Sequence, residues 1–250
     1  MIIWIPLIDL PDADNTCAMD QLPYLFCDAV IGTISDFVYG LSKQLELFEN
    51  STFSTWKSAF EEHYSSRQRF AFSVGFVDGN WSCQFYELNV KNGESRNYDF
   101  KTVQQLRRNY FQITEVTYAN FLYDNFSLWE EDDVLSKFAS SFEEIEEITK
   151  FIVPFLNLAS LRLINVKINE KDLSSLLSHF RNDHSQFYSL FVKQYRTCYE
   201  DLLLTQLRSD LLEYLEIEGD NWPKEIQLEV EEFVLTKSFK NVHCGNSNFV

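Results

Sequence analysis

Apolar and polar positions in the second half of the chain follow a repeating order: a short alternating run, then a longer run with helical spacing. Alternation of apolar and polar residues is typical of a strand with one buried face, and apolar residues every three or four positions are typical of a helix. The predicted strands lie at residues 160–165, 187–192, 212–217 and 239–244. The predicted helices lie at residues 144–156, 172–180, 197–207 and 222–235.

These cycles align on one apolar position in each strand. The aligned residues Leu161, Leu190, Leu215 and Val242 are separated by 29, 25 and 27 residues, within or at the edge of the leucine-rich-repeat range of about 20–29. A unit of this size cannot bury its own apolar face, so the units must stack, with strands on one face and helices on the other. We therefore expect a short, irregular leucine-rich-repeat-like strand-helix solenoid over residues 112–250, whose last cycle has no helix after its strand.

Two predicted helix starts support these cycles. Thr197 and Glu200 have the spacing of a capping box, in which the two side chains satisfy backbone N–H groups at the start of a helix. Asn221 precedes Trp222 and Pro223, which is the order of a capping residue followed closely by proline.

The first half of the chain has a different organisation. Residues 1–18 form an expected extension, and apolar residues recur at helical spacing over residues 19–68, with Ser54 as the expected cap of a second helix. Residues 70–76 and 81–87 alternate on either side of an Asp-Gly-Asn turn, which predicts a hairpin within residues 69–111. The chain is thus predicted to have an α/β fold, with a helical N-terminal segment before the solenoid.

Composition indicates an ordered chain, because 23 phenylalanines accompany only 7 glycines and 5 prolines. Thirty-eight acidic and 21 basic residues give a net charge of −17. That charge repels a polyphosphate backbone and anionic membranes, so we expect no nucleic acid and no membrane as partner. The acidity either favours a partner with a basic surface or keeps a phenylalanine-rich protein in solution.

Five widely spaced cysteines without a Cys-x-x-Cys motif suggest neither a disulfide framework nor a zinc site. The apolar start is short, has no positive flank and is a poor signal peptide. No stretch approaches the roughly 20 apolar residues that span a bilayer. We therefore expect an intracellular protein, cytoplasmic or nuclear.

Enzyme chemistry is not indicated by the motifs. The four histidines are His63, His179, His184 and His243, and none belongs to a His-x-x-x-His or His-Glu-x-x-His pattern. His243 and Cys244 are adjacent, but alternation along a strand directs their side chains to opposite faces. Gly-rich phosphate loops and Gly-x-Ser-x-Gly are absent. We predict no catalytic residues, no cofactor and no metal.

Carboxylates are densest in one region of the sequence. Its centre comprises Asp132, Asp133, Glu143, Glu144 and Glu147. One interpretation is that these groups follow helix N-termini, where the helix dipole favours negative charge. The other is an acidic patch that binds a basic partner.

Residues 19–30 contain Leu22-Pro23 followed by an apolar helical segment, and Trp56 comes after a second amphipathic segment. Together they resemble the start of a degenerate F-box. The downstream cycles resemble the irregular repeats of the nematode F-box-associated, leucine-rich-repeat-like families. The sequence segment at residues 215–223 shares this resemblance. The acidic residue usually found soon after Leu-Pro is absent here. By this resemblance, the residues that contact a Skp-type adaptor of a ubiquitin ligase would be Leu22, Pro23, Leu25, Phe26 and Val30.

Three classes of function follow. The first is a non-enzymatic interaction module that serves as a ubiquitin ligase substrate receptor, in which the repeats hold the target. The second is a stand-alone binder that sequesters a related protein without a ligase, in which case residues 19–30 are only a helical segment packed on the first strands. An enzyme of unknown class is the third, and no motif supports it.

Overall fold

The computed structural model describes residues 54–77, 79–88, 96–106, 108–119, 139–164, 166, 168–181, 187–236 and 241–245. The chain divides into two compact units, Met1–Ser66 and Arg67–Val250. In the first unit the described residues form one helix, α3 (Ser54–Ser66), where the second N-terminal helix was predicted. Ala59 and His63, one turn apart on α3, are buried. The helix predicted before residue 54 lies outside the described residues.

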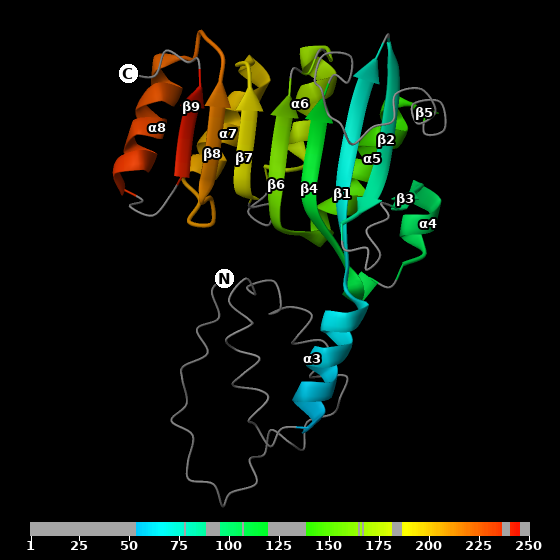
Figure 1. Cartoon of the computed structure of the whole chain (residues 1–250). Coiled ribbons are helices and arrows are strands. Elements are labelled where there is room, and N and C mark those ends of the chain that lie inside the picture. Colours follow the sequence, from blue (N-terminus) through cyan, green and yellow to red (C-terminus); the bar gives the residue numbers. More distant parts are fainter. Residues whose placement is uncertain are drawn as a thin grey trace, which may run out of the picture. The chain divides into compact units, whose positions relative to one another are not determined.

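The second unit contains one open, mixed sheet, seen face-on in Figure 1. Its described strands are β1 (Gln68–Val77), β2 (Asn80–Glu87), β3 (Arg96–Tyr98), β4 (Phe111–Ala119), β5 (Ala139–Ser140), β6 (Leu156–Ile164), β7 (Phe187–Lys193), β8 (Tyr214–Glu218) and β9 (Asn241–Gly245). Their order is β3-β2-β1-β4-β6-β7-β8-β9, and β5 pairs with β2. The α/β fold class predicted from the sequence is therefore confirmed.

Helices alternate with the later strands along the chain. They are α4 (Phe100–Gln104), α5 (Phe142–Ile152), α6 (Glu170–Ser178), α7 (Glu200–Leu207) and α8 (Lys224–Thr236). In Figure 1, α5, α6 and α7 lie behind the sheet. Their buried side chains join those of one sheet face in a single apolar core. Among the described residues, none of the helices combines the length and apolar character that a bilayer-spanning helix requires.

The register of the parallel strands confirms the predicted alignment of the cycles. Leu161 of β6 pairs with Leu190 of β7, Leu190 pairs with Leu215 of β8, and Leu215 pairs with Val242 of β9. Leu161, Leu190 and Leu215 are at most 1% exposed. The predicted alignment is correct because a residue that must face the core occupies the same register position in each strand.

The predicted hairpin is also confirmed. β1 and β2 are antiparallel, with Phe76 opposite Trp81 and Phe72 opposite Phe85. Gly79, in the turn, has a φ of 84°, a left-handed conformation that glycine adopts without steric cost. The other edge of β1 pairs in parallel with β4, so the hairpin extends the sheet of the later cycles.

Both helix caps predicted in the later cycles are wrong. Thr197 begins a 3₁₀ turn, Thr197–Tyr199, that has no side-chain cap, and α7 begins only at Glu200, whose carboxylate accepts a hydrogen bond from the hydroxyl of Tyr195. Asn221 has a φ of 65°, whereas a capping residue has extended backbone, and α8 begins three residues later at Lys224.

The helix predicted over residues 144–156 also ends earlier than expected. α5 stops at Ile152, and a 3₁₀ turn, Val153–Phe155, leads directly into β6. Pro154 explains the change, because it has no N–H with which to continue an α-helix.

Candidate functional site

The sheet has two chemically different faces. The face under the helices carries the aligned apolar row of Leu161, Leu190 and Leu215. Side chains alternate along a strand, so the residues on either side of this row belong to the opposite face. On β6 to β9 they form two transverse rows of paired residues: Ser160, Ser189, Tyr214 and Asn241, and then Arg162, Phe191, Glu216 and His243.

A hollow of about 310 Å³ lies over these two rows, and each of the four strands contributes to it. Ser160 and Ser189 are neighbours in the first row, and Tyr214 follows them on β8. In the second row the larger side chains of Arg162 and Phe191 come two residues after the two serines on the same strands. We attribute the hollow to the short serine side chains between these larger residues. We call it the β6–β9 hollow.

Aromatic rings border the β6–β9 hollow. The Arg162 guanidinium lies over the Phe191 ring, 5.2 Å from its centroid. The ring centroids of Tyr188 and Tyr214 are 5.0 Å apart, and 40% of Tyr214 is exposed. Burial, a hydrogen bond with Tyr214 and a hydrogen bond with Glu213 raise the pKa of Tyr188. Tyr188 thus supports Tyr214 as a fixed, partly exposed ring.

The charged groups of the hollow differ in their pairing. Arg162 stacks on Phe191, and Lys193 forms an ion pair with Glu218 over 3.8 Å just beyond the hollow. Within the described part of the chain, the side chains of Glu216 and His243 form no hydrogen bond or ion pair. Glu216 is partly buried and His243 is exposed. The hollow therefore contains one unpaired carboxylate, beside an aromatic ring and a cation.

In the row of Arg162, the accessible part of this face is limited to the later strands. On β2, β1 and β4, the residues in the same row as Arg162 are Gln84, Ser73 and Thr117. All three are buried, and Gln84 is only 1% exposed. In this row, a partner that approaches the face thus meets β6 to β9.

The predicted site residues fall into two groups. Seven of them lie outside the described residues: Leu22, Pro23, Leu25, Phe26, Val30, Asp132 and Asp133. Glu143, Glu144 and Glu147 are exposed on α5, with the first two in its first turn. The Ser141 hydroxyl caps this helix by accepting a hydrogen bond from the backbone N–H of Glu144 over 3.2 Å. The placement of Glu143 and Glu144 agrees with their interpretation as helix N-terminal residues, whereas Glu147 lies in the middle of α5. The acidic patch stays a hypothesis.

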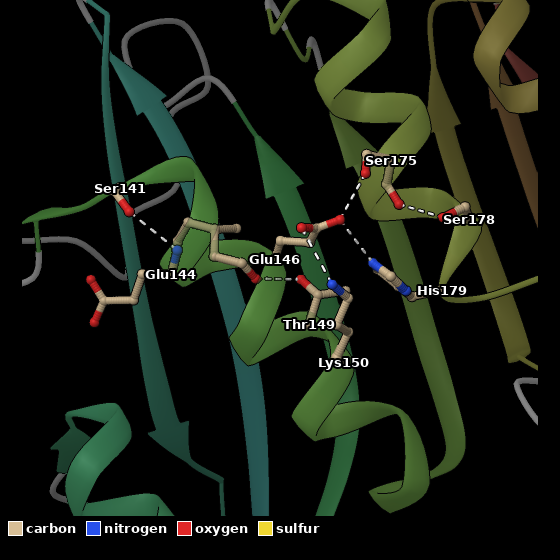
Figure 2. A network of polar contacts seen from close by, with 9 residues as sticks. Ser141, Glu144, Glu146, Thr149, Lys150, Ser175, Ser178 and His179 are labelled. Carbon is tan, nitrogen blue, oxygen red and sulfur yellow. Dashed lines mark hydrogen bonds and ion pairs between the residues drawn. The ribbon is translucent and has the colours of Figure 1, made fainter.

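A different acid on α5 takes part in a polar network, which Figure 2 shows. The Glu146 carboxylate accepts a hydrogen bond from the Ser175 hydroxyl over 2.8 Å, lies 3.3 Å from His179 Nε2, and pairs with Lys150 over 3.3 Å. The hydrogen bond from Ser175, followed by those from His179 and Lys150, lowers the pKa of Glu146. Because Ser175 lies on α6 and His179 directly follows this helix, the network joins two successive cycles.

The remaining reactive groups do not converge. Among the described residues, no three or more histidines, cysteines and acids lie close enough to hold a metal ion. Cys83 is buried in β2, Cys198 is partly buried before α7, and Cys244 is on β9. Burial raises the pKa of both Cys198 and Cys244, which lowers their thiolate fraction. As alternation predicted, His243 lines the hollow, whereas Cys244 pairs with Ile217 in a row of the other face.

None of the residues that line the β6–β9 hollow was predicted as a site residue, although the sequence contained the signal for them. The aligned residues were known to face the core, so their immediate neighbours had to face the other way. Reading one position before and one position after each aligned residue gives both rows of the hollow.

No family model, curated protein or solved structure matches this chain. The candidate site therefore rests on the geometry of the sheet alone. The resemblance of residues 19–30 to an F-box stays a hypothesis drawn from the sequence.

Proposed function

We propose that this protein is a non-enzymatic protein-binding module. Its strand–helix cycles act as a short leucine-rich-repeat-like solenoid, and its partner binds the face of β6 to β9 that lies opposite the helices. The observation that carries the proposal is the β6–β9 hollow, to which four adjacent strands contribute side chains. Repeat proteins commonly use such a sheet face, because stacked units form an extended binding surface.

The composition of the hollow supports a protein partner. Its volume of about 310 Å³ is at the lower end of the range of about 300–1,000 Å³ for small-molecule sites. Tyr214 and Arg162 belong to the residue types that dominate binding energy at protein interfaces, and Phe191 belongs to the aromatic types enriched there. The aromatic rings can supply apolar area, while the serines and Asn241 can supply hydrogen bonds.

A cross-linking experiment tests this proposal. We expect a photo-reactive p-benzoylphenylalanine at Tyr214 to give a discrete cross-linked species with the partner in cell extract. Ser189→Trp fills the hollow without entering the core, and we expect it to abolish that species. Thr236→Trp, on the exposed side of α8, is the matched control and should leave the species unchanged. If the yield is equal in both tryptophan variants, the hollow is not the binding site.

The ligase version of the proposal is supported by the sequence of residues 19–30. If the protein is a substrate receptor, a Skp-type adaptor should co-purify with the intact chain, and Leu22→Ala with Pro23→Ala should release it. Ser189→Trp should leave the adaptor bound, because it affects the other binding surface. A stand-alone binder instead shows no adaptor, and its cross-link at Tyr214 is unaffected by the changes at Leu22 and Pro23.

A further inference from the structure

We propose that the β6–β9 hollow takes a lysine or arginine side chain from a basic segment of the protein partner. The ammonium or guanidinium group pairs with Glu216, and the aliphatic stem lies against Phe191 and Tyr214. This inference rests on the proposed function and specifies the chemistry of the partner.

Glu216 is the feature that requires a cation. Its carboxylate is partly buried on β8 and has no hydrogen bond or ion pair within the described part of the chain. In register it lies between Phe191 of β7 and His243 of β9. A partner that covers the hollow removes the remaining water from this carboxylate, which is costly unless the partner supplies a charged donor.

The rings beside Glu216 suit the stem of a long basic side chain. Lysine and arginine bury their methylene groups against apolar surface while the charged end stays at a polar group. Phe191 is next to Glu216 in its row, and Tyr214 lies two residues before Glu216 on β8. The tilted contact of the Tyr188 ring with the Tyr214 ring, at 5.0 Å between centroids, holds that second ring in place. The face of an aromatic ring also attracts a cation directly.

Arg162 determines the side from which the basic group enters. It already lies over Phe191, and its strand is two positions from β8 in the sheet. Two strand spacings amount to about 10 Å, so Arg162 repels a second cation at β6 and leaves β8 and β9 as the favourable entry. Lys193 does not compete, because it is paired with Glu218.

The charge of the whole chain favours the same partner. A net charge of −17 attracts a basic segment at long range and raises its rate of encounter. An acidic segment would have to approach against this field and would meet the carboxylate of Glu216 in the hollow. A basic segment is therefore the occupant that both the local and the overall charge support.

A phage-displayed library of random dodecapeptides, selected on the intact protein, tests the inference. We expect the selected peptides to be enriched in lysine and arginine relative to the unselected library. Glu216→Gln should weaken a synthetic copy of the best peptide by about tenfold, the loss expected when one charge-assisted contact is removed. Glu225→Gln, an exposed acid on α8, is the matched control and should change the affinity less than twofold. Thermal unfolding of both variants shows that they remain folded.

The outcomes separate this inference from the proposed function. Peptides that are lost with Ser189→Trp but are acidic or carry no charge preference overturn the inference and leave the protein-binding function standing. Binding that persists in Ser189→Trp, or a library without any binder, counts against both. Basic peptides that bind equally to wild type and Glu216→Gln overturn the role of Glu216.

Discussion

At the scale of single residues, one backbone position recurs after two successive strands. Gln194 follows β7 and Gly219 follows β8, at equivalent places in the register, and both have left-handed backbone, with φ values of 70° and 95°. The Gln194 N–H donates to the carbonyl of Glu218 over 3.0 Å, so the two connections touch. This contact fixes the spacing between the two cycles at the end of their strands.

Gly219 is the position where the connection leaves least room. A Cβ placed there would lie 3.0 Å from the Gln194 Cα, a backbone atom that cannot rotate away. We expect Gly219→Ala to lower the free energy of unfolding by about 2–4 kcal/mol, the sum of left-handed strain and the forced shift of Gln194. Urea unfolding measures the change.

Gly79→Ala is the matched control for that prediction. Gly79 is also left-handed, with a φ of 84°, but nothing lies within 4 Å of a Cβ placed on it. It should therefore cost only the backbone strain, about 1–2 kcal/mol. An equal loss at the two glycines would show that the contact with Gln194 does not constrain the connection.

At the scale of elements, Glu146 joins α5 to α6, and this contact should depend on pH. Its folded-state pKa is lowered, so its stabilisation is present above the pKa of an unfolded glutamate, about 4.3, and is lost as the pH falls through the folded-state pKa. We expect Glu146→Gln to destabilise the protein at pH 7 and to approach wild type at acid pH. Urea midpoints across this range measure the difference.

Glu147→Gln provides the comparison on the same helix. Glu147 is exposed one residue further along α5, where it makes no contact with α6 through a hydrogen bond or ion pair in the described part of the chain. Its midpoint should follow wild type at every pH. A pH-independent loss in Glu146→Gln would mean that the glutamate acts through packing rather than charge.

The two faces of one strand give a second prediction at this scale. Leu190 is 1% exposed and pairs with Leu161 and Leu215, so Leu190→Ala leaves a cavity in the core. The expected cost is about 2–5 kcal/mol. Ser189→Ala changes the adjacent residue on the opposite face and should cost at most about 0.5 kcal/mol. If the serine variant lost as much stability as the leucine variant, the assignment of the two faces would be wrong.

The positions of the strands were predictable, because burial of one side chain decides them. The starts of the helices were not predictable, because local backbone geometry decides them. The strands at Leu161, Leu190 and Leu215 were found from their alternation, because each must place one side chain in the core. The caps at Thr197 and Asn221 were wrong because residue type permits a cap, but the backbone conformation before the helix decides whether one forms. Element identity was therefore more secure than element ends.

At the scale of the whole molecule, the accessible half of the binding face was not predictable. Ser73, Thr117 and Arg162 lie in one row, and their sequence context gives no sign that only the last is accessible. Burial of the first two depends on what packs against the sheet, which alternation does not encode. The same holds for the hollow, whose depth depends on Ser160 and Ser189 meeting as neighbours from separate cycles.

The position of each strand in the sheet predicts how readily it opens. β4 and β6 have paired neighbours on both sides, whereas β9 pairs with β8 alone among the described strands. Three of its five residues, Asn241, His243 and Cys244, are also exposed. Edge strands with little buried surface open at low free-energy cost, while central strands open only with the whole domain. Among β4, β6, β8 and β9, amide hydrogen exchange should therefore be fastest in β9, slower in β8 and slowest in β4 and β6.

A peptide bound in the hollow should change this gradient. Asn241 and His243 of β9 line the hollow together with residues of β6 to β8, so an occupant that contacts both sides ties the edge strand to its neighbours. Saturation with a basic peptide at about 100 times its Kd stabilises the bound form by about 2.7 kcal/mol. Amides of β9 should then exchange up to about a hundredfold more slowly. Amides of β4 exchange only on global unfolding, and their exchange should slow by no more than the same factor. Slowing confined to α5 and α6 would instead locate the peptide on the helix face.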